Sequence, residues 1–323
     1  MKVSRRAFSV GLAVAGIARP ALVRAAEPLT VGYVPGNAIH WVQSVAIDKG
    51  FYREVGFAAE AATMQSSAHA VQMAITGGFH IAATQPEPFA AAVQRGATML
   101  GAISAPMNAV DWGLIGAGTV ATLADLKGEV IGVSSPRAGD AWLTARLLAT
   151  HDLRKGEVGY LQVGTSPAKV TALLKGAIGA AVLFEPWAQI ATREGLPLLA
   201  RYDRMPAYPP GLYVVNQGWA SQGDAGRRVA HAIRRGHAWL WDPDNRAEAT
   251  KILAKYAKAD ATVLAAVYDD YFVGRRLYGR DGAIALAGLQ RALDDMAEDG
   301  EVFKVAPSAR QLVLDPSLGA ILA

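Results

Sequence analysis

Two glutamates of this chain stand in matching contexts, 98 residues apart. Glu87 precedes Pro88-Phe89, and Glu185 precedes Pro186-Trp187. Proline suits the first position of a helix, and a carboxylate there complements the positive end of the helix dipole. Two carboxylates in one cleft would also pair with an amine or amidine of a bound molecule. A purely structural role at a helix start is the alternative for both glutamates.

Hydroxyl side chains come directly before predicted helices at three places. The first turn of a helix has free N–H groups and a positive dipole end, so it attracts anions, and a hydroxyl adds a donor. Plain N-capping, worth typically ~1 kcal/mol, is the alternative for each of these residues. The hydroxyl residues expected to bind a ligand are Ser66, Ser67, Ser134, Ser135, Thr165 and Ser166.

Arg137 is the single arginine in the loops that are expected to carry the site. A guanidinium binds a carboxylate or sulfonate through two parallel hydrogen bonds. A salt bridge with Asp140 is the alternative, and the sequence favours neither interpretation. An anionic ligand would depend most on Arg137, whereas an aminopyrimidine or amine would depend on Glu185 and on a stacking face of Trp187.

Aromatic and amide side chains near the same loops complete the candidate site. Aromatic rings would form walls against a ligand, and His40 would donate a hydrogen bond. The alternative is that these residues pack in the core, as most aromatic side chains do. The set comprises Asn37, His40, Trp41, Gln85, Phe89, Trp112 and Trp187.

The residues around the two glutamates repeat as well. A repeat of about 100 residues indicates two similar lobes, because the repeats of a solenoid are only about 20–50 residues long. Short apolar strands alternate with helices in both halves, as in a parallel sheet covered by helices. Ligands of such sheets lie beyond the carboxyl ends of the strands, and clefts between domains bind small molecules. The loops at those ends are Pro35–Trp41, Met64–Ser67, Thr84–Pro88, Ser134–Asp140, Thr165–Pro167 and Phe184–Trp187.

In the first half the pattern predicts strands and helices that alternate: strands over Leu29–Val34, Phe57–Ala62 and Ile81–Ala83, and helices over Trp41–Lys49 and Ala68–Ile75. Trp112–Gly116 is expected to cross into the second lobe, where the alternation restarts at Glu129–Val133. Leu212–Val215 is expected to return to the first lobe.

The C-terminal part is expected to be helical without strands, and to pack on the first lobe and the hinge. Asn245 and Asp260 are the expected N-caps of two of its helices. The expected boundaries are residues 1–26 for an export signal, 27–114 for the first part of lobe one, 115–211 for lobe two, and 212–323 for the return to lobe one with the C-terminal helices.

Length and charge limit the class of protein. A chain of 323 residues suits two domains, and a hydrophobic content of 52% excludes general disorder. The formal net charge of +4 arises from five basic residues within the first 26, and the remainder carries 27 basic against 28 acidic side chains. A near-neutral remainder has no nucleic-acid or membrane-surface signature.

The first 26 residues are typical of an export signal. Ser4-Arg5-Arg6-Ala7-Phe8 is a twin-arginine pattern, and the apolar run Phe8–Ala18 is shorter than the roughly 18 residues a membrane-spanning helix needs. Ala25 and Ala26 offer a cleavage site. The chain has no cysteine, so we expect neither a disulfide nor a lipid anchor, and a mature protein outside the cytoplasm.

Enzyme motifs do not occur in the sequence. It contains no H-E-x-x-H, Walker loop or G-x-S-x-G turn, and its six histidines show no metal-site spacing. Gly116–Ala121 matches a dinucleotide fingerprint superficially, but it leads only into a short helix that Gly128 ends. We therefore expect a protein without catalytic residues, cofactor or metal.

Four phrases in the chain resemble one family. They are Gly50–Phe57 (GFYREVGF), Leu123–Gly128 (LADLKG), Ala172–Gly176 (ALLKG) and Phe184–Trp187 (FEPW). In this order, after an export signal, they resemble the periplasmic substrate-binding proteins of nitrate-, sulfonate- and taurine-type ABC importers, a family that includes thiamine-pyrimidine-precursor binding proteins. The resemblance covers nearly all of the mature chain.

The resemblance implies a two-lobe α/β protein with the type II periplasmic binding protein fold: two helix-covered mixed sheets joined by two crossover strands. It implies a monomer that closes around a small solute and delivers it to an ABC permease and ATPase. A sulfonate or carboxylate is the expected solute, and an aminopyrimidine thiamine precursor is the alternative. Enzymes on the same fold, of the menaquinone-pathway lyase or pyrimidine-precursor synthase type, and a sensor for a membrane receptor are further alternatives.

Overall fold

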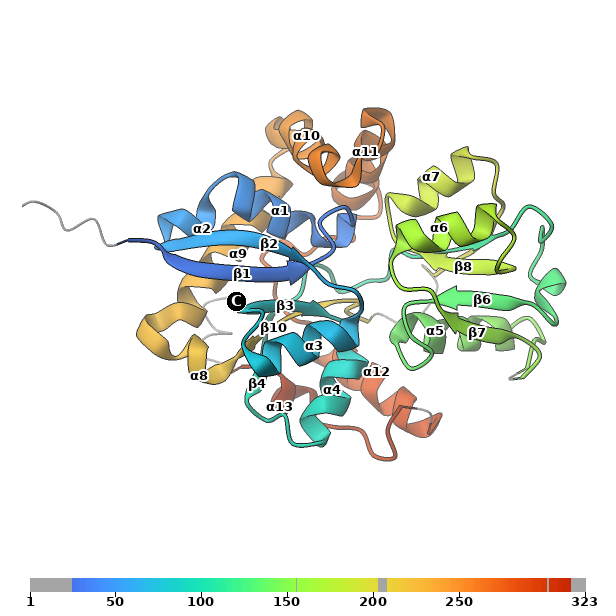
Figure 1. The fold of residues 1–323 in the computed structure, drawn as a ribbon, viewed down its shortest axis with the longest axis horizontal. Helices are drawn as coiled ribbons and strands as arrows, with labels where there is room; N and C mark the ends of the chain where they lie inside the picture. Colours follow the sequence, from blue (N-terminus) through green and yellow to red (C-terminus); the bar gives the residue numbers. More distant parts are fainter. Residues whose placement is uncertain (1–24, 155, 203–207, 301, 315–323) are drawn as a thin grey trace, which may run out of the picture.

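The chain folds into two α/β lobes, each built on one five-stranded sheet (Figure 1). The computed structural model describes residues 25–154, 156–202, 208–300 and 302–314. The predicted export signal, apart from its last two residues, lies outside this range. Among the described residues, no helix is long and apolar enough to cross a membrane.

The first sheet has the strand order β2-β1-β3-β10-β4. β1 runs parallel to β2 and β3, and Val31 at its centre pairs with both Ala61 and Ile81. β10 is antiparallel to β3 and β4, so the predicted return of the chain to this lobe is confirmed. The strands are β1 (Glu27–Tyr33), β2 (Phe57–Thr63), β3 (Ile81–Thr84), β4 (Leu100–Ser104) and β10 (Leu212–Asn216).

The second sheet repeats this arrangement with the order β7-β6-β8-β5-β9. β6 is parallel to β7 and β8, whereas β5 is antiparallel to β8 and β9. β5 thus has the place in this sheet that β10 has in the first, as expected of a repeat joined by two crossovers. The strands are β5 (Gly113–Gly116), β6 (Val130–Val133), β7 (Gly159–Gln162), β8 (Ala180–Leu183) and β9 (Leu198–Arg201).

Helices follow the parallel strands and cover both sheets. In the first lobe they are α1 (Trp41–Asp48), α2 (Phe51–Glu54), α3 (Ser67–Thr76) and α4 (Pro86–Gln94). In the second lobe they are α5 (Gly139–Ala149), α6 (Ser166–Leu174) and α7 (Trp187–Arg193), with short 3-10 turns at Ala38–His40 and Ala124–Leu126.

Helix α3 shows how the sequence sets these boundaries. It begins after Ser66, whose hydroxyl accepts a hydrogen bond from the His69 N–H at 3.1 Å. It ends at Gly77, where φ is +79°, a conformation that glycine adopts without strain. The N-cap and the C-terminal glycine together limit the helix to the segment between them.

The C-terminal helices pack around the first lobe and beside the hinge, as predicted (Figure 1). Helix α9 carries small and apolar residues at helical spacing, and this face packs on α1 and α2. The Asp260 carboxylate caps its helix by accepting the Thr262 N–H at 2.7 Å. Asn245 stands at the predicted cap position, but its amide donates to the Trp239 carbonyl instead. The segments are α8 (Gln217–Ala220), α9 (Ala225–Trp241), α10 (Arg246–Ala257), α11 (Ala261–Tyr268), a π-helix at Asp269–Gly274, α12 (Leu286–Glu298) and α13 (Ala309–Leu312), with 3-10 turns at Gln222–Asp224 and Pro243–Asn245.

Candidate functional site

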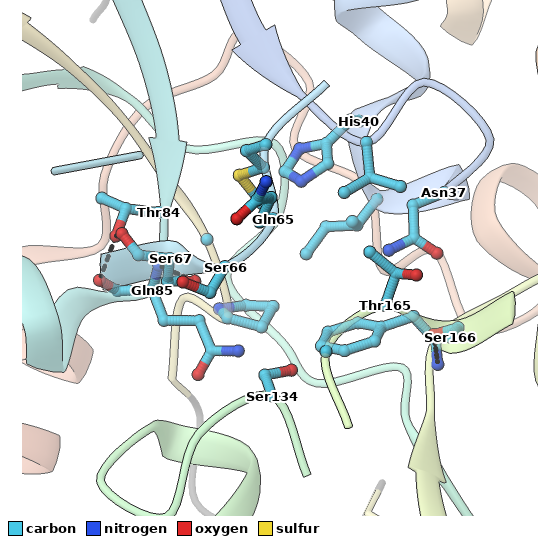
Figure 2. A pocket seen from close by; sticks show the side chains of 17 residues that line it. Asn37, His40, Gln65, Ser66, Ser67, Thr84, Gln85, Ser134, Thr165 and Ser166 are labelled. Carbon is cyan, nitrogen blue, oxygen red and sulfur yellow. Dashed lines mark hydrogen bonds between the residues drawn. The ribbon is translucent and has the colours of Figure 1, made fainter. Parts of the chain in front are cut away.

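The carboxyl ends of the parallel strands in the two sheets face each other across a small cavity (Figure 2). Its volume is about 50 Å³, and loops of both lobes line it together with Pro210 and Gly211, which precede β10. Figure 2 shows first-lobe side chains opposite second-lobe side chains across this space. The polar lining residues are Asn37, His40, Gln65, Ser66, Ser67, Thr84, Gln85, Ser134, Thr165 and Ser166.

Two helices begin at this cavity, one from each lobe. Ser66 and Thr165 are the N-cap residues of α3 and α6, and both line the cavity. The residue after each N-cap, which is the first of its helix, has the same role in both lobes. The Ser67 hydroxyl accepts the Gln85 N–H, and the Ser166 hydroxyl accepts the Phe184 N–H, each at 3.2 Å. These bonds tie each helix start to the end of the following strand, so the free helix N-termini are held at the cavity.

Several polar groups at the cavity remain available for a ligand. Among the described residues, the side chains of Asn37, Gln65 and Thr165 make no hydrogen bond, and the Asn37 amide oxygen is buried. A buried polar atom without a partner is costly, so a bound molecule that satisfied it would be stabilised. The described lining contains no Asp, Glu, Lys or Arg, so uncharged donors and helix ends dominate the cavity.

His40 lines the cavity as a neutral ring. It is only 5% exposed, and its Nδ1 lies 3.4 Å from the Tyr213 hydroxyl. Burial lowers the pKa of His40 to about 3, because the charged form would lose its hydration. The imidazole can therefore donate or accept a hydrogen bond at the cavity, but it brings no positive charge there near neutral pH.

A buried ion pair supports the second-lobe wall. The Lys169 ammonium lies 3.1 Å from Asp140 Oδ2, and both side chains are fully buried. Lys169 also donates to the Val182 carbonyl at 3.0 Å and to the Ser134 hydroxyl at 3.3 Å. Asp140 Oδ2 accepts the Ser134 N–H at 2.6 Å. The ion pair therefore positions Ser134, one of the hydroxyl residues that line the first cavity.

A second, larger cavity of about 330 Å³ lies beside the first. Its walls come from α3 and α4 of the first lobe and from residues 134–138 of the second, together with Val302. Ser67 and Ser134 line both cavities. Gln85 lines the first cavity, and its Oε1 accepts the Gly139 N–H of the other lobe at 2.8 Å. Ser135, Glu87 and Arg137 from the predicted set line this second cavity, together with Arg95.

The two repeated glutamates are buried at contacts between the lobes. Glu87 accepts a hydrogen bond from the Tyr208 hydroxyl, and a Cβ on Gly139 would lie 2.6 Å from its Oε1, so only glycine fits there. The Glu185 carbonyl accepts the Ala38 N–H at 2.8 Å, and its carboxylate accepts the Gln189 N–H at 3.1 Å. Each carboxylate keeps one buried oxygen without a hydrogen bond among the residues described, and this oxygen of Glu185 lies 3.8 Å from the Arg201 guanidinium. Burial raises the pKa of both glutamates to about 7.

Comparison with known proteins identifies the family. A family model described as the NMT1-like family matches residues 24–254. The chain belongs to the NMT1-like family. No curated protein matches the chain.

Solved structures similar to this NMT1-like chain share its fold. The alkanesulfonate-binding protein SsuA from Xanthomonas axonopodis pv. citri, bound to MOPS, has a TM-score of 0.74 at 17% identity, covering 89% of this chain and 98% of its own. The ligand binding component of an ABC-type import system from Staphylococcus aureus has a TM-score of 0.75 at 15% identity, covering 92% and 99%. The nitrate-binding protein NrtA from Synechocystis PCC 6803 has a TM-score of 0.72 at 15% identity, covering 93% and 86%. The fold and family that the sequence phrases predicted are confirmed.

The predicted aromatic residues lie away from the first cavity in this NMT1-like structure. Trp41 and Trp112 are fully buried, as is Phe89. The Trp41 indole packs against C-terminal helices and donates to the Ala249 carbonyl at 2.9 Å. Trp112 packs edge-on against Phe184, Tyr202 and Tyr208, and Trp187 packs against the smaller core cluster of the second lobe.

Most residues that line the first cavity belong to loops that were predicted from the sequence to carry the site. Gln65, Thr84 and Phe184 lie in the predicted loops but were not singled out as ligand residues. Lys169 was missed because it lies one turn inside a helix, where a lysine usually faces solvent. Asp140 pairs with this lysine, and the structure records no ion pair between Asp140 and Arg137.

Proposed function

We propose that this chain is the solute-binding component of an ABC importer and captures a small organic anion of the sulfonate or carboxylate class by closure of its two lobes. The observation that carries the proposal is the pair of helix starts, α3 and α6, that meet from opposite lobes at one cavity. Helix N-termini and hydroxyl donors favour negative charge, and the described lining adds no carboxylate that would repel it.

The relatives agree with this class of ligand. Two of the similar structures are named as alkanesulfonate- and nitrate-binding proteins, so the fold is compatible with anion binding. An aminopyrimidine would need Glu185 and Trp187 at the site, and neither lines the first cavity. The proposal includes no catalytic step.

Location and partners follow from the same proposal. The twin-arginine pattern at Arg5 and Arg6 supports export to the periplasm, and the absence of cysteine leaves no residue for a lipid anchor. A permease and an ATPase in the membrane would receive the solute, and we propose that the binding protein acts as a monomer.

Removing hydroxyl and amide groups from the first cavity should weaken solute binding. A thermal-shift screen of sulfonates, carboxylates and aminopyrimidines identifies the solute, because a ligand at about one hundred times Kd stabilises the folded protein by about 2.7 kcal/mol. Calorimetry with that solute should show that Thr165→Val and Asn37→Ala each bind it at least tenfold more weakly, since a hydrogen bond to a charged group contributes about 1.5–3 kcal/mol.

Thr171→Val is the matched control for Thr165→Val. Thr171 lies on the exposed side of the same helix, and its hydroxyl bonds the Pro167 carbonyl, so this variant should bind normally. Small-angle scattering should show a smaller radius of gyration with the solute. Equal binding by Thr165→Val and Thr171→Val, or an aminopyrimidine as the tightest ligand, would contradict the proposed site or ligand class.

Export should depend on the twin arginines. Replacing Arg5 and Arg6 with lysine should leave the precursor in the cytoplasm, because the twin-arginine route requires the arginine pair. Fractionation and immunoblotting report the two locations, and mass spectrometry of the exported wild-type protein should show a new N-terminus near Ala25 or Ala26. Normal export of the lysine variant would refute this route.

A further inference from the structure

We infer that the second interlobe cavity is a separate binding site for an amphipathic organic anion, which holds the anion's apolar body against α3 and α4 and its acidic group between Arg95 and Arg137. The existence of this site does not depend on which solute the first cavity binds. Its residues come from both lobes, and Arg95, which follows α4, has no counterpart in the first cavity.

The apolar wall follows from helical spacing. Residues 68, 71, 72 and 75 of α3 recur at intervals of three and four and line the cavity. Residues 88, 91 and 92 of α4 do the same, together with residue 95 just beyond its end. Ile75, which is 39% exposed, adds an accessible aliphatic side chain to this wall. A cavity of about 330 Å³ lies within the usual size range of small-molecule sites, roughly 300–1,000 Å³.

Charge identifies the kind of ligand. Arg95 comes from the first lobe and Arg137 from the second, both are exposed, and neither guanidinium has an ion-pair or hydrogen-bond partner among the described residues. Two unpaired cations at the edge of an apolar surface fit a molecule with an apolar body and a carboxylate, sulfonate or phosphate group. The buried Glu87 carboxyl is held by the Tyr208 hydroxyl at the floor of the cavity. Since burial raises the pKa of Glu87 to about 7, this carboxyl is mostly uncharged at pH 6 and does not repel an anion there.

The position of the site couples it to closure. Arg137 and Ser135 of the second lobe line the same cavity as α3 and α4 of the first, so an anion that contacts both arginines would bridge the lobes and favour the closed form. Gln85 lines only the first cavity, whereas Arg95 and Arg137 line only the second, so the two ligands would occupy neighbouring but distinct spaces. By linkage, an anion in the second cavity would favour closure around a solute in the first.

Calorimetry with naphthalene-2-sulfonate at pH 6 tests the site. This probe carries a rigid apolar body and one acidic group, and naphthalene-2-sulfonamide is its neutral counterpart. We expect saturable binding of the sulfonate, at least tenfold weaker binding of the sulfonamide, and at least tenfold weaker sulfonate binding by the variant Arg95→Gln with Arg137→Gln. The matched control Arg53→Gln with Arg193→Gln removes one exposed arginine from each lobe elsewhere and should bind normally.

The variant Thr165→Val separates the two cavities. It alters only the first cavity, so it should bind naphthalene-2-sulfonate as the wild type does, whatever it does to solute binding. Scattering should show compaction on saturation with the sulfonate. The inference is overturned if the wild type shows no saturable binding, or if the sulfonamide binds as tightly as the sulfonate. It is also overturned if the double arginine variant binds the sulfonate as tightly as its control, or if Thr165→Val loses as much sulfonate affinity as the double arginine variant should. An unchanged radius of gyration on saturation would overturn it as well.

Discussion

Lys169→Met should destabilise the folded protein by about 3–5 kcal/mol, the usual cost of leaving one member of a buried ion pair without its partner. Asp140 would keep its hydrogen bonds from the Ser134 and Ala141 N–H groups, but its buried charge would lose the ammonium 3.1 Å away. Urea denaturation of the two proteins at pH 7 measures the difference in the free energy of unfolding.

Two further variants show that the effect arises from the pair. Lys175→Met removes an exposed lysine just beyond the same helix and should change the free energy of unfolding by less than about 0.5 kcal/mol. Adding Asp140→Asn to Lys169→Met should recover part of the loss, because the uncompensated charge is then absent. If Lys169→Met costs no more than Lys175→Met, the ion pair does not support the lobe as we describe.

Strand and helix positions were predictable because the signals that define them are local. Phe57–Ala62 was expected and Phe57–Thr63 is found, and Leu212–Val215 was expected and Leu212–Asn216 is found. Apolar runs bounded by glycine and polar loops specify such buried strands without reference to the rest of the chain. The repeat of the Glu-Pro motif added the non-local information that the chain forms two similar lobes.

Side-chain partners were not predictable because they depend on packing between distant elements. Asp140 pairs with Lys169, 29 positions along the chain, rather than with nearby Arg137, because α6 brings the lysine under the β6 loop. Trp41 was expected at the cavity, yet its ring turns toward Tyr268 and Phe272 of the C-terminal helices. Those helices offer an apolar surface whose position no local pattern reveals.

The pH dependence of stability should reveal the two buried glutamates. Burial raises the pKa of Glu87 and Glu185 to about 7 from 4.5. Between pH 4.5 and pH 7 the carboxyl of the unfolded chain has released its proton, whereas that of the folded chain still holds it. The free energy of unfolding therefore falls as the pH rises from 4.5 to 7, and it levels off above pH 7. Each glutamate should therefore cost about 3 kcal/mol at pH 8 relative to pH 4.5.

Glutamine variants isolate this effect from other titrating groups. His40 and His237 act in the opposite direction, since burial lowers the pKa of each and stability is lost as the pH falls below 6.5. We therefore compare each variant with the wild type at the same pH. Glu87→Gln and Glu185→Gln should each gain stability relative to the wild type, by about 2–3 kcal/mol, as the pH rises from 5 to 8.

Glu194→Gln changes an exposed glutamate at the end of α7, and its difference from the wild type should stay constant over the same pH range. Denaturation in urea at pH 5, 6, 7 and 8 for the four proteins gives the required free energies. A Glu87→Gln profile parallel to the wild-type profile would mean that Glu87 is already ionised in the folded state at pH 5. The buried carboxyl at the junction of the lobes would then carry a full charge, and the floor of the second cavity would repel anions at pH 6.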